Sequence, residues 1–142
     1  MEFLIATVGA FAIMAISVLL HYQSMVIARG VLDGSGLSRR IGVLLGMASV
    51  TAAQMGSIVI YAFAFYAMDN WLGIGSLAGE TDGSLLDQFY FSIMSYTTLG
   101  VGDIYPLGAF RIVSGIEALN GFALIGWTAS FAYTLMRQGW AD

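Results

Sequence analysis

Three long apolar segments dominate this chain, and they constrain its fold more than any other feature. They cover residues 3–27, 41–68 and 107–136 of the 142. Each exceeds the roughly 20 residues that an α-helix needs to cross about 30 Å of hydrocarbon. Only 10% of the residues are charged, against about 25% in an average soluble domain. The chain is therefore predicted to be an integral membrane protein with three helical spans.

Two absences narrow the possibilities further. The opening residues MEFLIA contain an acid and no basic residue, unlike the start of a secretory signal, so we expect the first span to be retained. The sequence contains no cysteine, which excludes a disulfide framework, a thiolate metal site and a cysteine nucleophile.

The charges are unevenly divided between the connecting segments. Residues 29–40 contain three arginines and one aspartate, whereas residues 69–87 contain four acidic residues and no basic one. An excess of arginine in a short loop marks the cytoplasmic side. We therefore expect a multi-pass protein of the cell membrane, with the N-terminus and residues 69–106 outside and the C-terminus in the cytoplasm.

The segment between the second and third spans is too apolar to be a plain external loop. Within it, Ser84 is followed three residues later by Asp87, a pattern similar to a helix-capping box. A helix over 84–96 would reach about 20 Å at 1.5 Å per residue, which is short of a full crossing. A re-entrant helix is therefore predicted, because non-helical backbone at membrane depth must be buried in protein or line a water-filled path.

The residues after this helix read TTLGVGD at 97–103. Alternate glycines permit the positive φ values that other residues avoid, so successive carbonyls can turn to one side. Such a row of carbonyls can replace the hydration shell of a cation. One chain supplies one carbonyl at each level, so several copies must surround a common axis.

This motif, with the half-length helix before it and Pro106 and a glycine-containing span after it, resembles the pore domain of potassium channels. The resemblance implies an all-α membrane fold with an outer helix over 41–68, a pore helix over 84–96, a filter at 97–103 and an inner helix over 107–136. Residues 1–40 would add an N-terminal membrane helix and a cytoplasmic loop. It also implies a homotetramer in the lipid bilayer that conducts monovalent cations passively, with no enzymatic activity, no cofactor beyond bound potassium and no nucleic-acid partner.

The same resemblance assigns individual roles. Potassium ions would bind at Thr98, Leu99, Gly100 and Val101, and Gly102 would complete the filter. The filter support and outer mouth would be formed by Thr97, Asp103, Tyr90, Phe91 and Met94. Gly121 stands ten residues after Arg111, in the place of the inner-helix hinge glycine. The other inner-helix or cavity positions would be Glu117, Ala118, Phe122, Ile125 and Ala129.

Two departures from the family pattern concern the support of the filter. Val101 stands where the family has a tyrosine, and Tyr90 and Phe91 stand where it has a pair of tryptophans. Met94 stands where some members carry a glutamate behind the filter. Potassium selectivity is therefore less well supported than the fold, and a non-selective cation channel is the alternative.

Two further residues within the predicted spans carry possible chemistry: the acid Glu117 and the single histidine, His21. An acid inside a span is costly and functional by default. Glu117 could contribute to a ring of acids that attracts cations into the cavity, or it could lie behind the filter, hydrogen-bonded to Ser95, Tyr96 or Thr97. We expect the second arrangement. His21 is expected to be an interfacial polar residue near the cytoplasmic end of the first span.

Two alternatives come from other functional classes. Gly-x-Gly-Asp is also a signature of intramembrane aspartyl proteases, with Asp103 as one catalytic acid. Such an enzyme needs a second aspartate facing the first, and the remaining aspartates lie in predicted loops or at the ends of the chain. The other alternative is a structural membrane subunit that has the channel fold but does not conduct.

Overall fold

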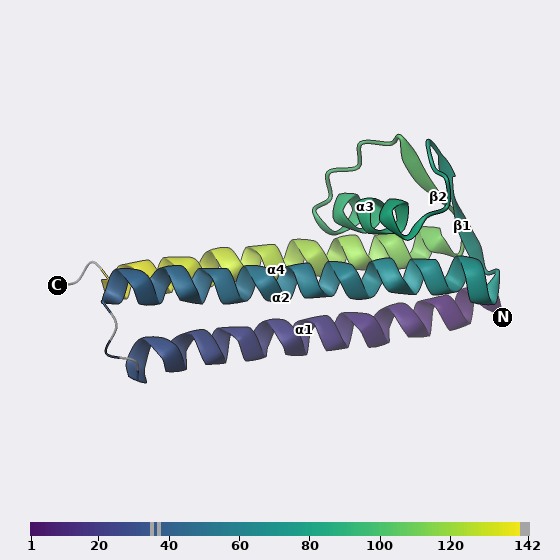
Figure 1. Ribbon diagram of the computed structural model, residues 1–142. Helices are drawn as coiled ribbons and strands as arrows, with labels where there is room; N and C mark the ends of the chain where they lie inside the picture. Colours follow the sequence, from purple (N-terminus) through teal and green to yellow (C-terminus); the bar gives the residue numbers. More distant parts are fainter. Residues whose placement is uncertain (35, 37, 140–142) are drawn as a thin grey trace.

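Three long helices form the body of the protein in a computed structural model, which describes residues 1–34, 36 and 38–139 (Figure 1). They are α1 (Glu2–Gly34), α2 (Arg39–Ala67) and α4 (Phe110–Gly139). Each contains a stretch long and apolar enough to cross a membrane, at Glu2–Gly30, Arg40–Leu72 and Phe110–Arg137. The three predicted spans are therefore confirmed, and the protein is a multi-pass membrane protein.

The three helices lie side by side, with α1 packed against both α2 and α4. Toward the end where α2 begins and α4 ends, the shared core contains Met25, Ala28, Val50, Phe131 and Leu135. Gly46 of α2 makes this contact close, because a Cβ atom there would lie 3.2 Å from the Leu135 side chain and 3.4 Å from Ala28. A small residue in such a place lets helix backbones approach each other in lipid.

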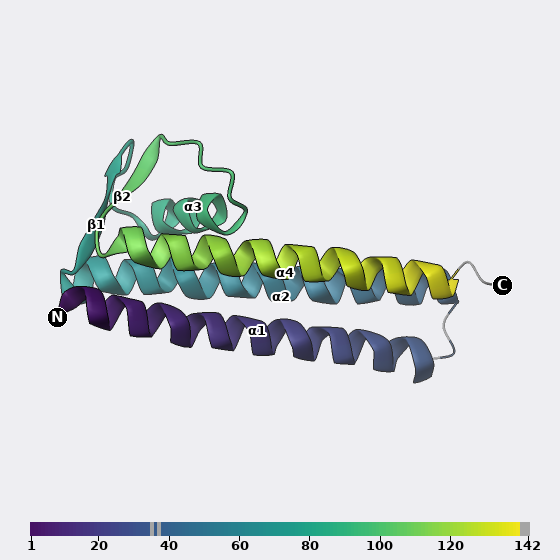
Figure 2. The same cartoon turned by 180° about the vertical axis from the view of Figure 1, so that it is seen from behind.

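The segment between α2 and α4 lies at the other end of the bundle, on the side of α2 and α4 that faces away from α1 (Figure 2). A five-residue π-helical turn, η1 (Met68–Leu72), prolongs α2 and leads to strand β1 (Gly75–Gly79). Helix α3 (Leu85–Tyr96) follows, and then strand β2 (Ile104–Gly108). The 12 residues of α3 reach about 18 Å at 1.5 Å per residue, which is well short of a membrane span.

The two strands form an antiparallel sheet in which Gly75 pairs with Gly108 and Gly79 with Ile104. A side chain at Gly79 would overlap the carbonyl oxygen of Asp103, and the φ of this glycine is +104°. The sheet therefore ties both ends of the α3 segment together beside Asp103. It was not anticipated from the sequence, although the fold class is mainly helical as expected.

Several expected boundaries need correction. The inner helix begins at Phe110 and not at residue 107, because Leu107 and Gly108 pair with β1. The connecting loop expected over 29–40 is shorter, because α1 continues to Gly34 and α2 already begins at Arg39. The turn includes Gly36, whose φ of +60° a helix cannot accommodate. Residues 35 and 37 of this expected loop lie outside the described residues.

Three contacting aromatic rings attach α3 to the long helices. Phe91 of α3 meets Phe65 of α2 edge to face at 5.2 Å between ring centroids, and Phe65 meets Phe110 of α4 at 4.9 Å. All three rings are buried. Aromatic pairs at these separations add stability beyond the burial of their area, so the base of α3 is held firmly against both α2 and α4.

Candidate functional site

Helix α3 begins at a network of short hydrogen bonds. Ser84 is its N-cap, and the Ser84 hydroxyl accepts from the Asp87 N–H at 3.3 Å. The Asp87 carboxylate accepts from the Thr81 hydroxyl and the Asp82 N–H, each at 2.8 Å. Ser84 therefore caps the helix as expected. The Asp87 carboxylate does not complete a capping box, because it bonds the preceding loop. A hydrogen bond from Ser84 to the Asp82 carboxylate lowers the pKa of Asp82 below its usual value.

The other end of α3 is capped by a residue in the left-handed backbone conformation. The Leu99 N–H donates to the Met94 carbonyl and the Thr98 N–H to the Ser95 carbonyl, both at 3.0 Å. This is the Schellman arrangement, in which the residue after the cap has positive φ and is usually glycine. Here it is Thr98, with φ of +59°. A β-branched residue in this conformation is an outlier, and such strain of about 1–3 kcal/mol clusters at functional sites.

The sign of φ alternates along the residues that follow Thr98. Gly100 has φ of +55° and Gly102 has φ of +90°, whereas Leu99 and Val101 are not among the residues with positive φ. Neither glycine has a neighbouring atom that would obstruct a side chain within this chain, so it is the backbone conformation that requires glycine. The segment 98–102 thus alternates in handedness, as the glycine spacing predicts.

The outer end of this segment is tied to α3 by one side-chain hydrogen bond. The Tyr90 hydroxyl donates to the Asp103 carboxylate at 2.8 Å. This bond raises the pKa of Tyr90 and lowers the pKa of Asp103, since it favours the neutral phenol and the charged carboxylate. A second Asp103 oxygen accepts from the Ile104 N–H at 3.0 Å. Asp103 is therefore fastened to α3 through Tyr90.

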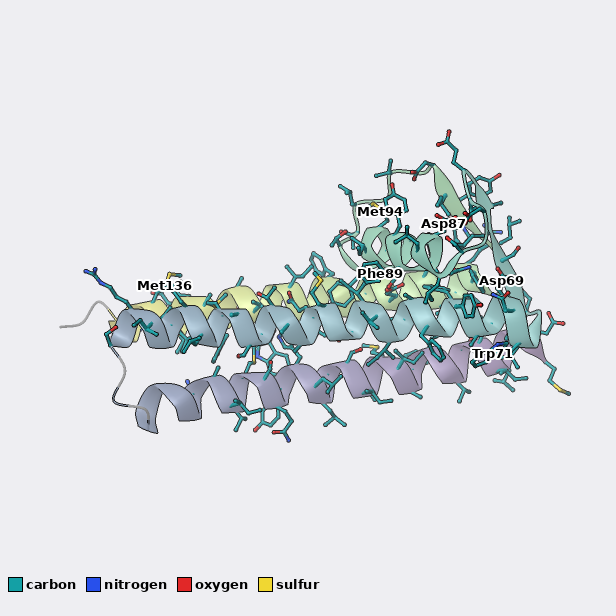
Figure 3. The ribbon with its side chains drawn as sticks, viewed as in Figure 1. Asp69, Trp71, Asp87, Phe89, Met94 and Met136 are labelled. Carbon is teal, nitrogen blue, oxygen red and sulfur yellow. The ribbon has the colours of Figure 1, made fainter. Side chains whose placement is uncertain are left out.

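An open groove of 460 Å³ lies between the 98–102 segment, α3 and α4. It brings together seven of the residues expected at the site: Phe91, Met94, Thr98, Gly100, Val101, Gly102 and Ala118. Figure 3 shows Met94 at the end of α3 nearest this segment and Asp87 at the opposite end. Leu99 and Val101 have 65% and 59% of their surface exposed within a single chain. Both side chains therefore lie open at the surface of the single chain.

Helix α4 passes close behind the start of this segment. A Cβ atom on Gly121 would overlap the Tyr96 carbonyl oxygen, so only glycine allows this approach. Phe122, Ile125 and Ala129 lie on the exposed side of α4, away from Gly121. The structure does not bring these three residues to the groove, and their place in a cavity stays a prediction.

Glu117 lies one turn before Gly121 and is fully buried. Its carboxyl contacts the Ser92 hydroxyl at 2.5 Å, and the same hydroxyl lies 2.9 Å from the Ile58 carbonyl of α2. An acid buried between α2, α3 and α4 does not face a central cavity, so the acid-ring interpretation is wrong. The expected partners at 95–97 are also wrong, since the rotation of α3 presents Ser92 to Glu117.

His21 is also buried, which corrects the expected interfacial position. Its Nε2 lies 3.2 Å from the Thr128 hydroxyl of α4, and Gln54 of α2 donates to the same hydroxyl at 2.8 Å. The Thr128 hydroxyl itself donates to the Leu124 carbonyl at 2.9 Å. When Thr128 donates its single proton to Leu124, Nε2 of His21 is the donor of its contact with Thr128. A polar junction thus joins α1 to both other long helices.

Two residues of the site escaped sequence reasoning. Ser92 resembles any small polar residue of a membrane helix until its partners are known. Gln88 is fully buried and donates to Asp69 of η1 at 3.4 Å. Their spacing could have indicated this role, because Gln88 and Ser92 lie four residues apart and so share one face of α3.

Comparison with known proteins gives one match. Residues 53–138 match the model of a protein family described as "Ion channel". The matched region contains the second half of α2, all of α3 and nearly all of α4, and it leaves α1 outside. No curated protein and no solved structure matches the chain.

Proposed function

Because the chain belongs to this ion-channel family, that of the two-span potassium-channel pore domain, we propose that it is a passive channel selective for potassium. The family comprises channels and not enzymes, which counts against the aspartyl protease. Asp103, the acid that such a protease would use, accepts a hydrogen bond from Tyr90. The proposal goes beyond the family in naming the ion, the filter residues and the assembly.

One observation carries the proposal: the alternating handedness of residues 98–102 directly after the end of a half-length helix. In an extended strand, successive carbonyls point to opposite sides. Positive φ at every second residue turns alternate peptides over, so that the carbonyls of Thr98, Leu99, Gly100 and Val101 can line one side. Potassium ions would bind between these levels, with Gly102 and Asp103 at the outer mouth.

Helix α3 supplies a second contribution to cation binding. The aligned peptide dipoles of an α-helix place about half of a negative charge at its C-terminal end. This end, at Tyr96, leads directly into the 98–102 segment. A cation resting below the filter would therefore be stabilised by α3 without any charged side chain.

A single chain cannot complete such a filter, so the proposed assembly is a homotetramer. Each chain contributes one carbonyl at each level, whereas a dehydrated cation needs several. The open groove beside Val101 and the exposure of Leu99 support this assembly, because a neighbouring copy would cover both. Native mass measurement in mild detergent should give four chains per particle, and a conducting monomer or dimer would refute the tetramer.

The proposed orientation has the filter end outside and the C-terminus in the cytoplasm, with the N-terminus outside. It follows from the arginines of residues 29–40 and the acids of residues 69–87. The chain has no cysteine, so Ser38→Cys and Glu80→Cys each introduce a single thiol at an exposed residue. An impermeant reagent should label Glu80→Cys from outside and Ser38→Cys from the cytoplasm. The reverse pattern would overturn the orientation.

Ion flux from liposomes that contain the purified protein tests the function. We expect potassium efflux at a rate well above that of sodium under equal gradients. Gly102→Ala should abolish this selectivity, because alanine is strained at the positive φ of this position. Gly9→Ala is the control, since Gly9 lies on α1 with no atom within 4 Å of a new Cβ.

Each other outcome identifies a specific alternative. Equal flux of potassium and sodium would make the protein a non-selective cation channel, which the missing tyrosine at Val101 would explain. No flux of either ion from correctly folded protein would refute conduction and favour the structural subunit.

A further inference from the structure

The carboxyl of Glu117 is enclosed by three helices at the depth of the membrane. Its side chain is fully buried, and one oxygen, Oε2, has no hydrogen-bond partner among the described residues. The other oxygen, Oε1, lies 2.5 Å from the hydroxyl of Ser92 on α3. The protonation state of Glu117 therefore depends on how this single contact is made.

The number of available protons decides whether Glu117 is a neutral carboxylic acid or a carboxylate. The Ser92 hydroxyl has one proton and lies 2.9 Å from the Ile58 carbonyl oxygen, which can only accept. If Ser92 donates to Ile58, the contact between Ser92 and Glu117 needs a proton from Glu117. Both contacts are hydrogen bonds only when Glu117 is a neutral carboxylic acid. If Glu117 were a carboxylate, Ser92 would donate its hydrogen bond to Glu117, and no proton would remain for the contact between Ser92 and Ile58.

The surroundings of Glu117 also favour the neutral form. The titratable groups facing it are Tyr61 from α2 and Tyr96 from α3, and phenols are neutral at pH 7. Its neighbour on α4 is Asn120, which donates to the Tyr61 hydroxyl at 3.5 Å. Within the described chain no cation faces the carboxyl. An ionised carboxyl that is buried without a partner charge or a full set of donors is strongly disfavoured.

The position of Ser92 connects this acid to the filter. Ser92 lies on α3, Ile58 on α2 and Glu117 on α4, so the two hydrogen bonds fasten the short helix to both neighbouring spans. The helix ends at Tyr96, and the 98–102 segment follows directly. Any shift of α3 would therefore move the filter. The usual tyrosine anchor is missing at Val101, which leaves the filter more dependent on the placement of α3.

We propose that Glu117 is a positioning residue, a neutral acid that donates its proton to Ser92 and so holds α3 at the level where the filter forms. The positioning role depends on the proposed channel function, whereas the proton on Glu117 does not. Loss of this proton at alkaline pH would put a charge between three helices and loosen α3. The filter should then lose selectivity while α1, α2 and α4 stay associated.

Infrared spectroscopy of the purified protein at pH 7 tests the proton directly. Carboxyls in contact with water are ionised at this pH, so we expect a carbonyl stretching band of a protonated acid that disappears in Glu117→Gln. Glu80→Gln is the control, because Glu80 is exposed on the outer loop and should leave the band unchanged. Absence of the band from the native protein would overturn the proposal, whether or not the protein conducts.

Ion flux tests the positioning role with matched variants. Glutamine can still donate to Ser92, so Glu117→Gln should keep the ratio of potassium to sodium flux within about two-fold of native and remove the part of any alkaline decline that comes from Glu117. Glu117→Ala offers no donor and should lower the ratio by about ten-fold. Equal losses in both variants would overturn the positioning role. A native protein that shows the band but conducts no ion would refute the channel and support the proton assignment.

Discussion

Two buried polar junctions lie in the membrane-spanning part of this protein, and they differ in what they join. Around Glu117, the hydrogen bonds run through Ser92 and link α3 to α2 and α4. Around His21, they run through Thr128 and link α1 to α2 and α4. The first junction lies entirely within the region that matches the ion-channel family, whereas His21 lies outside it. Similar chemistry thus fastens the short helix α3 in one place and the N-terminal helix α1 in the other.

The comparison separates stability from function. Buried polar groups are costly when unpaired, so damage to either junction should weaken the protein. Only the Glu117 junction holds the short helix that precedes the filter. We therefore expect changes near Glu117 to alter ion selectivity, and changes near His21 to alter stability alone.

The largest expected effect is that of a side chain placed in the close contact between α4 and the end of α3. In Gly121→Ala the new Cβ would overlap the Tyr96 carbonyl oxygen, and backbone atoms cannot move aside cheaply. Overpacking costs about 1–3 kcal/mol, occasionally more, and we expect the upper end here, with loss of the folded assembly on gel filtration. The matched change on α2 is Gly46→Ala, whose new Cβ would meet only side-chain atoms, of Leu135 at 3.2 Å and of Ala28 at 3.4 Å.

In Gly46→Ala the Leu135 side chain can move aside, and alanine is the better helix former by about 1 kcal/mol. The melting temperature of this variant should therefore stay near native. Equal destabilisation by the two changes would show that the contact between Gly121 and Tyr96 has no special role.

The second prediction compares the central hydroxyl of each junction. Ser92→Ala and Thr128→Val should each lower the free energy of unfolding by about 1–3 kcal/mol, because each leaves buried polar groups unpaired. Thermal denaturation in detergent measures this loss. In ion flux, Ser92→Ala should lower the ratio of potassium to sodium, whereas Thr128→Val should leave it unchanged. A loss of selectivity in Thr128→Val would show that α1 also controls the filter.

These contrasts also show the limits of sequence reasoning. The three spans follow from apolar length alone, and the alternating handedness at 98–102 follows from Gly100 and Gly102. The sheet was missed because GSLAG at 75–79 and IYPLG at 104–108 contain glycine and proline and lack alternation. The partner of Glu117 was placed one turn too late, because spacing along α4 does not define the rotation of α3 against it.

The third prediction concerns pH at the outer mouth. The pKa of Asp103 is lowered by its hydrogen bond with Tyr90, so the stabilisation is present above about pH 4 and is lost as pH falls through the pKa of the folded protein. The pKa of Tyr90 is raised by the same bond. The stabilisation is therefore present below about pH 10 and is lost as pH rises through the pKa of Tyr90 in the folded protein. The contribution of this bond to selectivity should therefore be constant between these limits and decline outside them.

Tyr90→Phe removes the bond and should flatten this profile, with selectivity reduced roughly five-fold within the window. The flux ratio measured from about pH 3 to about pH 11 checks both variants. An unchanged profile in Tyr90→Phe would assign the pH dependence to other groups.

The smallest expected effect is that of Val101→Tyr. Val101 and Phe91 line the same groove, where valine offers packing contacts worth about 0.1–0.2 kcal/mol for each atom pair. A tyrosine could add a hydroxyl anchor, so selectivity should rise modestly, by about two- to five-fold, with fewer brief closures in single-channel records. No change would show that α3, held by Ser92, already determines the width of the filter.

The reversal potential of the native protein in a planar bilayer, with potassium on one side and sodium on the other, tests the central claim most directly. If the carbonyls of residues 98–101 form a potassium-selective filter, the current should reverse at a large potential of the sign set by potassium. Gly102→Ala, measured in the same way, should move this potential toward zero. A native current that reverses at zero would contradict potassium selection by this filter, and a current carried by anions would contradict a carbonyl-lined pathway altogether.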